Sequence, residues 1–307
     1  MKRSILNLTV YGTVLALILT GCSVFSTPQP PTPTPMPFGM IDIGRYELYY
    51  ECSGQGSPTV ILESGGGADS SYWAAVIEAI EDTTRVCTYD RVNLGRSDSI
   101  PGPRTFQDMT RDLQALLENA HIGGSYILVG WSMGGSLVRI FADQHPGEVV
   151  GVVLVDSAHP DMGQRLLACL PLESAGEPEN ILFLRQFFGW MSQSNGSSFP
   201  NVEGVNTYAS DQQARSVESL GDLPLVVISQ GSNIPGLGLP MITSHGPLPA
   251  ETDACLQQVW QDMQSELAGL SSNTTRLTAQ GGHMIPVEQP ELIVQAIAEL
   301  VNAAGGR

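Results

Sequence analysis

Positively charged residues are scarce in this sequence, and nowhere are they concentrated. Only 14 of its 307 residues are lysine or arginine, against 31 aspartates and glutamates, which gives a formal net charge of −17. Nucleic-acid binding depends on clustered Lys and Arg side chains that neutralise phosphates. The sequence therefore argues against a nucleic-acid partner.

The sequence also lacks the short motifs that hold metals or nucleotides. It contains no His-Glu-x-x-His, no Cys-x-x-Cys and no phosphate-binding P-loop. Its run of three glycines, Gly65-Gly66-Gly67, does not form a dinucleotide-binding fingerprint. We therefore expect neither a metal nor a cofactor.

The first residues have the pattern of a targeting segment rather than of a folded domain. Lys2 and Arg3 precede an apolar run over residues 10–20 that is too short to span a bilayer comfortably. The segment ends at Cys22, and this arrangement resembles a bacterial lipoprotein signal. The resemblance implies removal of residues 1–21, lipidation of Cys22 and an extracytoplasmic protein anchored to the cell membrane. The alternative is an ordinary secretory peptide or an uncleaved anchor.

A linker and one folded domain are expected after this segment. Residues 22–40 are rich in proline and threonine, a composition that favours extended polyproline II and cannot build a core. Over residues 41–307, apolar runs alternate with helical patterns, which predicts a mostly parallel sheet covered on both faces. Residues 160–221 interrupt this alternation with an irregular stretch that contains a short aromatic helix. The expected strands cover residues 46–51, 59–62, 84–89, 127–129, 149–155, 223–229 and 276–279, and the main helices cover residues 73–80, 106–117, 133–141, 252–268 and 290–301.

One tight turn carries the clearest chemical pattern in the chain. Gly130-Trp131-Ser132-Met133-Gly134 lies between a predicted buried strand and a predicted helix, and it matches Gly-x-Ser-x-Gly. Such a turn forces its serine into a strained conformation, and the flanking glycines let strand and helix approach without a Cβ clash. The turn predicts a nucleophilic serine at a helix N-terminus. The alternative is a plain connection between strand and helix.

Five stretches together resemble the α/β-hydrolases, a family with a Ser-His-acid triad, along essentially all of residues 41–307. They are Leu-Glu-Ser-Gly-Gly-Gly at 62–67, Tyr-Asp-Arg-Val-Asn-Leu-Gly-Arg-Ser at 89–97, the serine turn, Val-Leu-Val-Asp at 153–156, and Gly-Gly-His at 281–283 followed by Glu-Gln-Pro at 288–290. Two positions depart from the family pattern. Ser64-Gly65 replaces the usual His-Gly, and Asn93 stands where glycine is usual, although Asn also tolerates a positive φ.

The resemblance implies an eight-stranded, mostly parallel sheet with helices on both faces and a lid inserted after the sixth strand. Ser132 would be the nucleophile, and His283, the histidine of the late Gly-Gly-His, would be its base. The backbone N–H groups of Gly66 and Met133 would form the oxyanion hole. For Gly66, the alternative is a flexible turn that does not contact substrate.

The triad acid requires a choice between two positions. In this family the acid usually follows the seventh strand, where the first carboxylates here are Glu251 and Asp253. These residues are expected to begin a helix, and a role at its N-terminus explains them. Some members take the acid from the end of the sixth strand, where this chain has Asp156. We therefore expect Asp156 to be the acid, with Asp253 as the alternative.

The resemblance also implies which cysteines form disulfide bridges. Apart from Cys22, four remain, an even number in an exported chain. The strands that hold Cys52 and Cys87 are neighbours in this fold, so these two are expected to form a bridge. Cys169 would then pair with Cys255. The alternative is four buried thiols.

The predicted function is that of an extracytoplasmic serine hydrolase, and within that class of a carboxylic ester hydrolase that forms an acyl-enzyme on Ser132. Aromatic residues in the stretch 181–190 of the predicted lid either line an apolar acyl pocket or only pack the lid onto the body. The expected partners are a small apolar ester and the membrane, through Cys22. The same triad also serves peptidases and carbon–carbon bond hydrolases, and a non-catalytic binding lipoprotein is a further alternative.

Overall fold

The computed structural model describes residues 37–192, 201–231, 234–239, 242 and 244–305. The predicted signal segment, Cys22 and most of the predicted linker lie outside these residues, as does the stretch 193–200 of the predicted lid.

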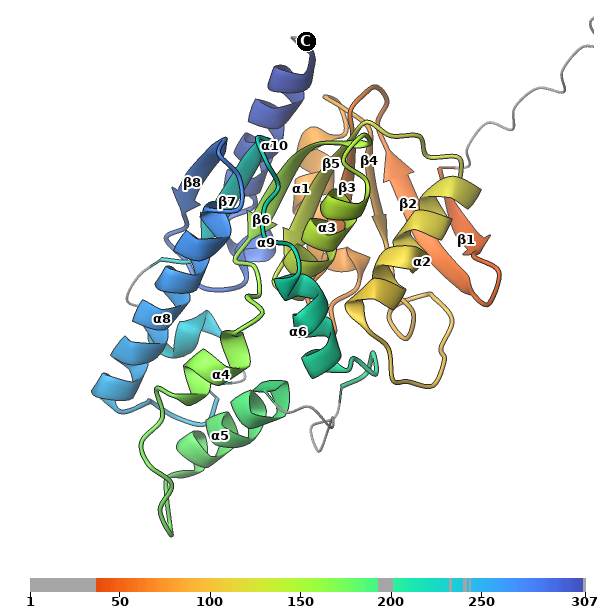
Figure 1. The fold of residues 1–307 in the computed structure, drawn as a ribbon. Helices are drawn as coiled ribbons and strands as arrows, with labels where there is room; N and C mark the ends of the chain where they lie inside the picture. The colour runs from red at the N-terminus through yellow and green to blue at the C-terminus, as the bar shows by residue number, and fades with distance from the viewer. Residues whose placement is uncertain (1–36, 193–200, 232–233, 240–241, 243, 306–307) are drawn as a thin grey trace, which may run out of the picture. The chain divides into compact units, whose positions relative to one another are not determined.

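An eight-stranded sheet forms the centre of the fold, with strand order β1-β2-β4-β3-β5-β6-β7-β8 (Figure 1). The edge strand β1 pairs antiparallel with β2, and β2 pairs antiparallel with β4, whereas β3 to β8 all run parallel. This arrangement confirms the mostly parallel sheet that the sequence predicted. The strands are β1 Phe38–Asp42, β2 Glu47–Ser53, β3 Thr59–Glu63, β4 Val86–Tyr89, β5 Tyr126–Trp131, β6 Val149–Val155, β7 Leu225–Ser229 and β8 Thr274–Thr278.

Helices cover both faces of this sheet because the side chains of its central strands are apolar on both sides. In β5, Leu128 packs against α2 and α3, while its neighbours Ile127 and Val129 point to the opposite face, with α1 and α10. The helices are η1 Ser70–Trp73, α1 Ala74–Ile80, α2 Phe106–Asn119, α3 Met133–Gln144, α4 Met162–Leu167, α5 Glu179–Ser192, α6 Thr207–Arg215, η2 Pro235–Gly238, α8 Ala250–Ala268, α9 Ile285–Glu288 and α10 Pro290–Gly305.

The first strand of the sheet was not predicted from the sequence, which indicated no strand before residues 46–51. β1 starts at Phe38, so residues 38–40 belong to the sheet and not to the predicted linker 22–40. The strand lies at the edge of the sheet, where its Phe38 and Met40 side chains are exposed. It is held by backbone pairing with β2 and lacks the buried, alternating pattern by which strands are recognised in a sequence.

The stretch between β6 and β7 is more regular than the sequence indicated, because its described part, residues 156–192 and 201–224, contains three helices where one was expected. α4 and α5 pack together with α8 and η2 around buried apolar side chains such as Leu184, Phe188 and Met263. α6 packs instead against α2 and α3, with Ala214 buried there. Figure 1 shows α4, α5 and α6 grouped beyond the end of β6.

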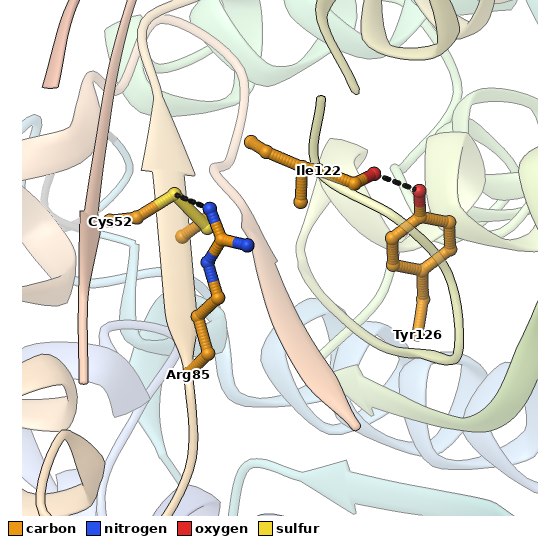
Figure 2. Close-up of a disulfide and its surroundings, with 5 residues drawn as sticks. Cys52, Arg85, Ile122 and Tyr126 are labelled. Carbon is orange, nitrogen blue, oxygen red and sulfur yellow. Dashed lines mark hydrogen bonds between the residues drawn. A yellow bond between two sulfur atoms is a disulfide. The ribbon is translucent and has the colours of Figure 1, made fainter. Parts of the chain in front are cut away.

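Two disulfides cross-link this fold, between the pairs expected from the sequence. Cys52 and Cys87 lie directly opposite each other in β2 and β4, and Figure 2 shows Arg85 donating a hydrogen bond to the Cys52 sulfur. In the same view the Tyr126 hydroxyl donates to the Ile122 carbonyl over 2.6 Å. The second bridge joins Cys169, just after α4, to Cys255 in α8. Each bridge closes a long loop and thereby restricts the unfolded chain.

Across the described residues, no helix combines the length and the apolar character that crossing a membrane requires.

Candidate active site

Ser132 occupies the strained position that its turn requires. It sits between β5 and α3 with φ 54° and ψ −120°, a region that non-glycine residues rarely adopt and that costs about 1–3 kcal/mol. The flanking glycines are obligatory for steric reasons. A Cβ on Gly130 would lie 2.5 Å from the Gly134 carbonyl oxygen, and one on Gly134 would lie 2.4 Å from the Glu63 carbonyl oxygen. The turn therefore places Ser132, which is partly buried, at the N-terminus of α3.

Asp156 and His283 form a direct, buried pair. Asp156 follows β6, is fully buried, and has a positive φ of 41°. Its Oδ2 accepts a hydrogen bond from His283 Nδ1 over 2.6 Å. Its Oδ1 accepts two more, from the Gln230 backbone N–H (2.9 Å) and from Trp260 Nε1 (2.8 Å). With three donors the carboxylate is fixed in orientation, and it holds the histidine with Nδ1 protonated and Nε2 free to act as a base.

His283 is placed beside the serine turn by its backbone and by its ring. Trp131, the residue before Ser132, donates from Nε1 to the His283 carbonyl over 2.8 Å, and the two ring centroids are 5.6 Å apart. The glycine before the histidine is also required, because Gly282 lies against Gly238. A Cβ on Gly282 would be 2.8 Å from the Gly238 Cα. These contacts bring the loop after β8 to the same end of the sheet as β5 and β6.

Ser132, Asp156 and His283 thus lie at the same end of the sheet, where the parallel strands end. Of the three, only Asp156 and His283 are joined by a hydrogen bond. Within the described part of the chain, Ser132 Oγ makes no hydrogen bond to His283. Nucleophile–base contacts are often long before substrate binds, so this geometry is compatible with a triad.

Asp253, the alternative acid, is engaged elsewhere. It lies in the first turn of α8, where its Oδ1 accepts from the Gly236 backbone N–H (2.8 Å) and its Oδ2 accepts from Gln257 Nε2 (2.9 Å). Both carboxylate oxygens therefore have local structural partners. The geometry favours Asp156 as the partner of His283.

The other well-buried histidine has a separate environment. His159 Nδ1 accepts from the Asp161 backbone N–H, and its Nε2 lies 3.3 Å from Glu266. Burial lowers the pKa of His159 to about 4, which keeps it neutral at pH 7. His145 ends α3 beside Glu148, as a helix-terminal residue. Neither histidine has a contact with Asp156.

The residues predicted to form the oxyanion hole lie against each other. A Cβ on Gly66 would be 3.6 Å from Met133 Sδ, and one on Gly65 would be 3.3 Å from the Ser132 Cβ. Met133 is the first residue of α3, so its N–H has no acceptor within the helix. No group of the described chain accepts from the Gly66 N–H. Within the described chain, neither amide N–H therefore has a backbone acceptor.

A buried charge network behind the glycine run was not predicted. Arg91 pairs with Glu63 and with Glu203, each over 2.6 Å, and all three side chains are at most 3% exposed. Tyr89 also donates to Glu63. Burial raises the pKa of Glu63, although Arg91 and Tyr89 oppose that shift. A signal was present in the sequence, because a charge inside an apolar strand, such as Glu63, requires a buried partner.

Among the described residues, no group of three or more His, Cys, Asp or Glu side chains is arranged to hold a metal ion.

Comparison with known proteins identifies the family. The family model described as alpha/beta hydrolase fold matches residues 58–223, more than half of the chain. The protein therefore belongs to the α/β-hydrolase fold family.

Among curated proteins and solved structures, the chain is similar to the following. The chain is 28% identical to a protein of Hormonema carpetanum named "Probable transporter efuK", over 86% of this chain but only 42% of that protein. It is 25% identical to "Uncharacterized protein YqjL" of Bacillus subtilis, over 82% of this chain and 86% of that protein. A thermophilic esterase from Thermogutta terrifontis has a similar structure, with a TM-score of 0.56 and 23% identity over 87% of this chain and 98% of the esterase.

Proposed function

We propose that this protein is a serine hydrolase that cleaves carboxylic esters through an acyl-enzyme on Ser132. The observation that carries the proposal is the buried Asp156–His283 hydrogen bond beside a strained serine turn. A nucleophile, a base and an orienting acid at one sheet edge are the groups that acyl transfer needs. A binding protein would need neither the backbone strain nor the buried carboxylate.

The proposed reaction has two halves. His283 Nε2 removes the proton from Ser132 Oγ as that oxygen bonds to the ester carbonyl carbon, and the Gly66 and Met133 amides stabilise the oxyanion. Asp156 stabilises the imidazolium, which then gives its proton to the departing alcohol oxygen as the ester bond breaks. Water repeats the attack on the acyl-enzyme, again through His283, and releases the carboxylic acid and the free serine.

The inserted stretch between β6 and β7 is proposed to act as a lid that helps form the acyl pocket. Phe188 in α5 is buried in the apolar cluster that α4 and α5 share with α8 and η2, so this ring packs the segment onto the body. Phe183 and Phe187 stack on each other and are only partly buried. These aromatic rings support a preference for apolar acyl groups.

A panel of substrates tests the reaction class. We expect hydrolysis of p-nitrophenyl esters, with kcat/KM changing systematically with acyl chain length, and slower cleavage of the matching anilides. Faster turnover of peptides, or of 1,5-diketones that require carbon–carbon cleavage, would favour the alternative reactions. Absence of turnover with every substrate would favour the binding lipoprotein.

Replacing Trp260 by phenylalanine is expected to lower kcat by about tenfold to a hundredfold, with little change in KM. The change removes one hydrogen bond to the Asp156 carboxylate, worth about 1.5–3 kcal/mol, while an aromatic ring still packs beside His283. Steady-state kinetics with an ester, together with a thermal unfolding curve, measure the effect. Unchanged kcat in the folded variant would show that the Gln230 amide alone is sufficient to hold the acid.

We also propose that Cys22 is the mature N-terminus and carries lipid, with residues 22–37, which precede β1, serving as a stalk outside the cytoplasm. The two disulfides fit this location, because such bridges persist in oxidising compartments. Intact-mass measurement of membrane-extracted protein should show loss of residues 1–21 and addition of acyl mass, and Cys22→Ser should move the protein to the aqueous fraction. An unlipidated wild-type protein from the native host would refute the anchor.

A further inference from the structure

The Arg91 guanidinium uses its donors on two carboxylates and on the backbone of the glycine run. Its Nε and Nη2 donate to Glu203 (2.6 and 2.9 Å), and its Nη1 donates to Glu63 (2.6 Å). The same two terminal nitrogens donate to the carbonyl oxygens of Ser64 (2.7 Å) and Gly65 (2.6 Å). A single buried cation therefore connects β3, the loop after it and the inserted stretch that carries Glu203.

These bonds determine which way the Gly66 amide points. The Gly65 carbonyl and the Gly66 N–H belong to one planar peptide unit, in which the two groups point in opposite directions. Because Arg91 holds the carbonyl, the Gly66 N–H is directed away from Arg91. The next peptide unit is held as well, since the Gly67 N–H donates to Glu203 Oε1 over 2.7 Å. The Ala68 N–H also donates to the Gly65 carbonyl, over 3.2 Å, so the turn itself holds this peptide unit in part. Three consecutive glycines have little conformational preference of their own, so the shorter bonds from Arg91 and Glu203 add the main restraint.

Glu203 is itself held in a well-defined turn. The Gly204 N–H donates to the Asn201 carbonyl, and the Arg104 N–H donates to the Gly204 carbonyl over 2.8 Å. The Asn206 N–H in turn donates to the Arg104 carbonyl over 2.8 Å. The carboxylate thus reaches the glycine loop from a fixed backbone position in the inserted stretch.

We propose that the Arg91–Glu203 pair is a positioning element that holds the Gly66 amide in the direction required of an oxyanion donor. The inserted stretch then contributes to catalysis through Glu203, in addition to any contact with substrate. The inference rests on the proposed ester hydrolysis at Ser132. Stabilisation of the fold is the competing explanation, and a buried ion pair is by itself weak evidence for that role.

The test compares Glu203→Gln with Glu177→Gln. Both remove one charge from a carboxylate that binds an arginine through two of its nitrogens, and both lie between β6 and β7. Glu177 pairs with Arg185 and has no contact with the glycine run. For Glu203→Gln we expect kcat for a p-nitrophenyl ester to fall by about 10- to 100-fold with KM nearly unchanged, less than the 10²- to 10³-fold typical of losing a whole donor. Glu177→Gln should keep kcat within about twofold of wild type, because substitutions away from the site usually change free energies by less than about 0.5 kcal/mol.

Binding of a trifluoromethyl ketone provides the second readout, because its tetrahedral adduct carries an oxyanion and its affinity reports on the donors. The affinity should fall in Glu203→Gln by the same factor as kcat and stay unchanged in Glu177→Gln. Arg91→Lys should lose kcat and ketone affinity together, as Glu203→Gln does, since an ammonium cannot bind two carboxylates and two carbonyls at once. Unfolding curves establish that the variants are folded.

The inference would be overturned if folded Glu203→Gln or Arg91→Lys kept the kcat and the ketone affinity of the wild type. It would also be overturned if Glu177→Gln lost as much kcat and affinity as Glu203→Gln. Loss of the folded state in both Glu203→Gln and Arg91→Lys would assign the pair to stability alone and would also overturn it. The proposed function fails separately, if wild-type protein neither hydrolyses the ester nor binds the ketone.

Discussion

Replacing Ser132 by alanine is expected to abolish ester hydrolysis, with a fall in kcat on the order of 10⁶. The substitution removes the oxygen that would attack the carbonyl, and no other group in the described site can form the acyl-enzyme. Alanine also accepts the positive φ at this position no better than serine, so the fold should be retained with similar strain. The measurement is steady-state kinetics with a p-nitrophenyl ester, accompanied by circular dichroism.

His283→Ala serves as the companion variant. Members of a triad act as a unit, so its loss should be nearly as severe, and the double variant should be little worse than either single one. Turnover close to wild type in Ser132→Ala or in His283→Ala would contradict the assignment. Additive losses in the double variant would show that the two residues act independently.

Asp156→Asn is expected to reduce kcat by about 10³- to 10⁴-fold while the protein stays folded. An asparagine in this position no longer fixes the histidine tautomer and no longer stabilises the imidazolium. The comparison variant is Asp253→Asn, which should leave kcat almost unchanged because both oxygens of Asp253 bind Gly236 and Gln257.

The two aspartate variants are measured under identical conditions, with unfolding curves recorded for each. The assignment of the acid would be wrong if Asp253→Asn were severely impaired and Asp156→Asn were not. Such a reversal would leave the proposed hydrolysis at Ser132 intact, because it changes only the source of the acid.

The features that sequence could predict are those set by local constraints. The Gly130 and Gly134 positions follow from the steric demands of a tight turn between a strand and a helix, and the structure shows backbone atoms less than 3 Å from any Cβ placed there. Asp156 could be selected because no carboxylate follows β7 until Glu251. Short continuous apolar runs located the central strands, because these strands are buried on both faces.

The features that sequence could not predict depend on contacts between distant residues. Glu203 meets Arg91 across 112 positions of sequence, within a stretch whose pattern is otherwise polar. Trp260 reaches Asp156 across 104 positions, from a helix that has no chemical motif of its own. β1 was missed because it is held by backbone pairing at the edge of the sheet. In each case the local sequence contains a residue of the right type but no indication of its partner.

Labelling with a fluorophosphonate probe tests the central claim most directly. The probe reacts with an activated serine oxygen by displacement of fluoride, so it reports on the nucleophile without knowledge of the natural substrate. We predict one phosphonyl group per chain, located by peptide mapping on the peptide that contains Ser132, and no labelling of Ser132→Ala. Failure of the folded wild-type protein to react, or a label on any residue other than Ser132, would contradict the account.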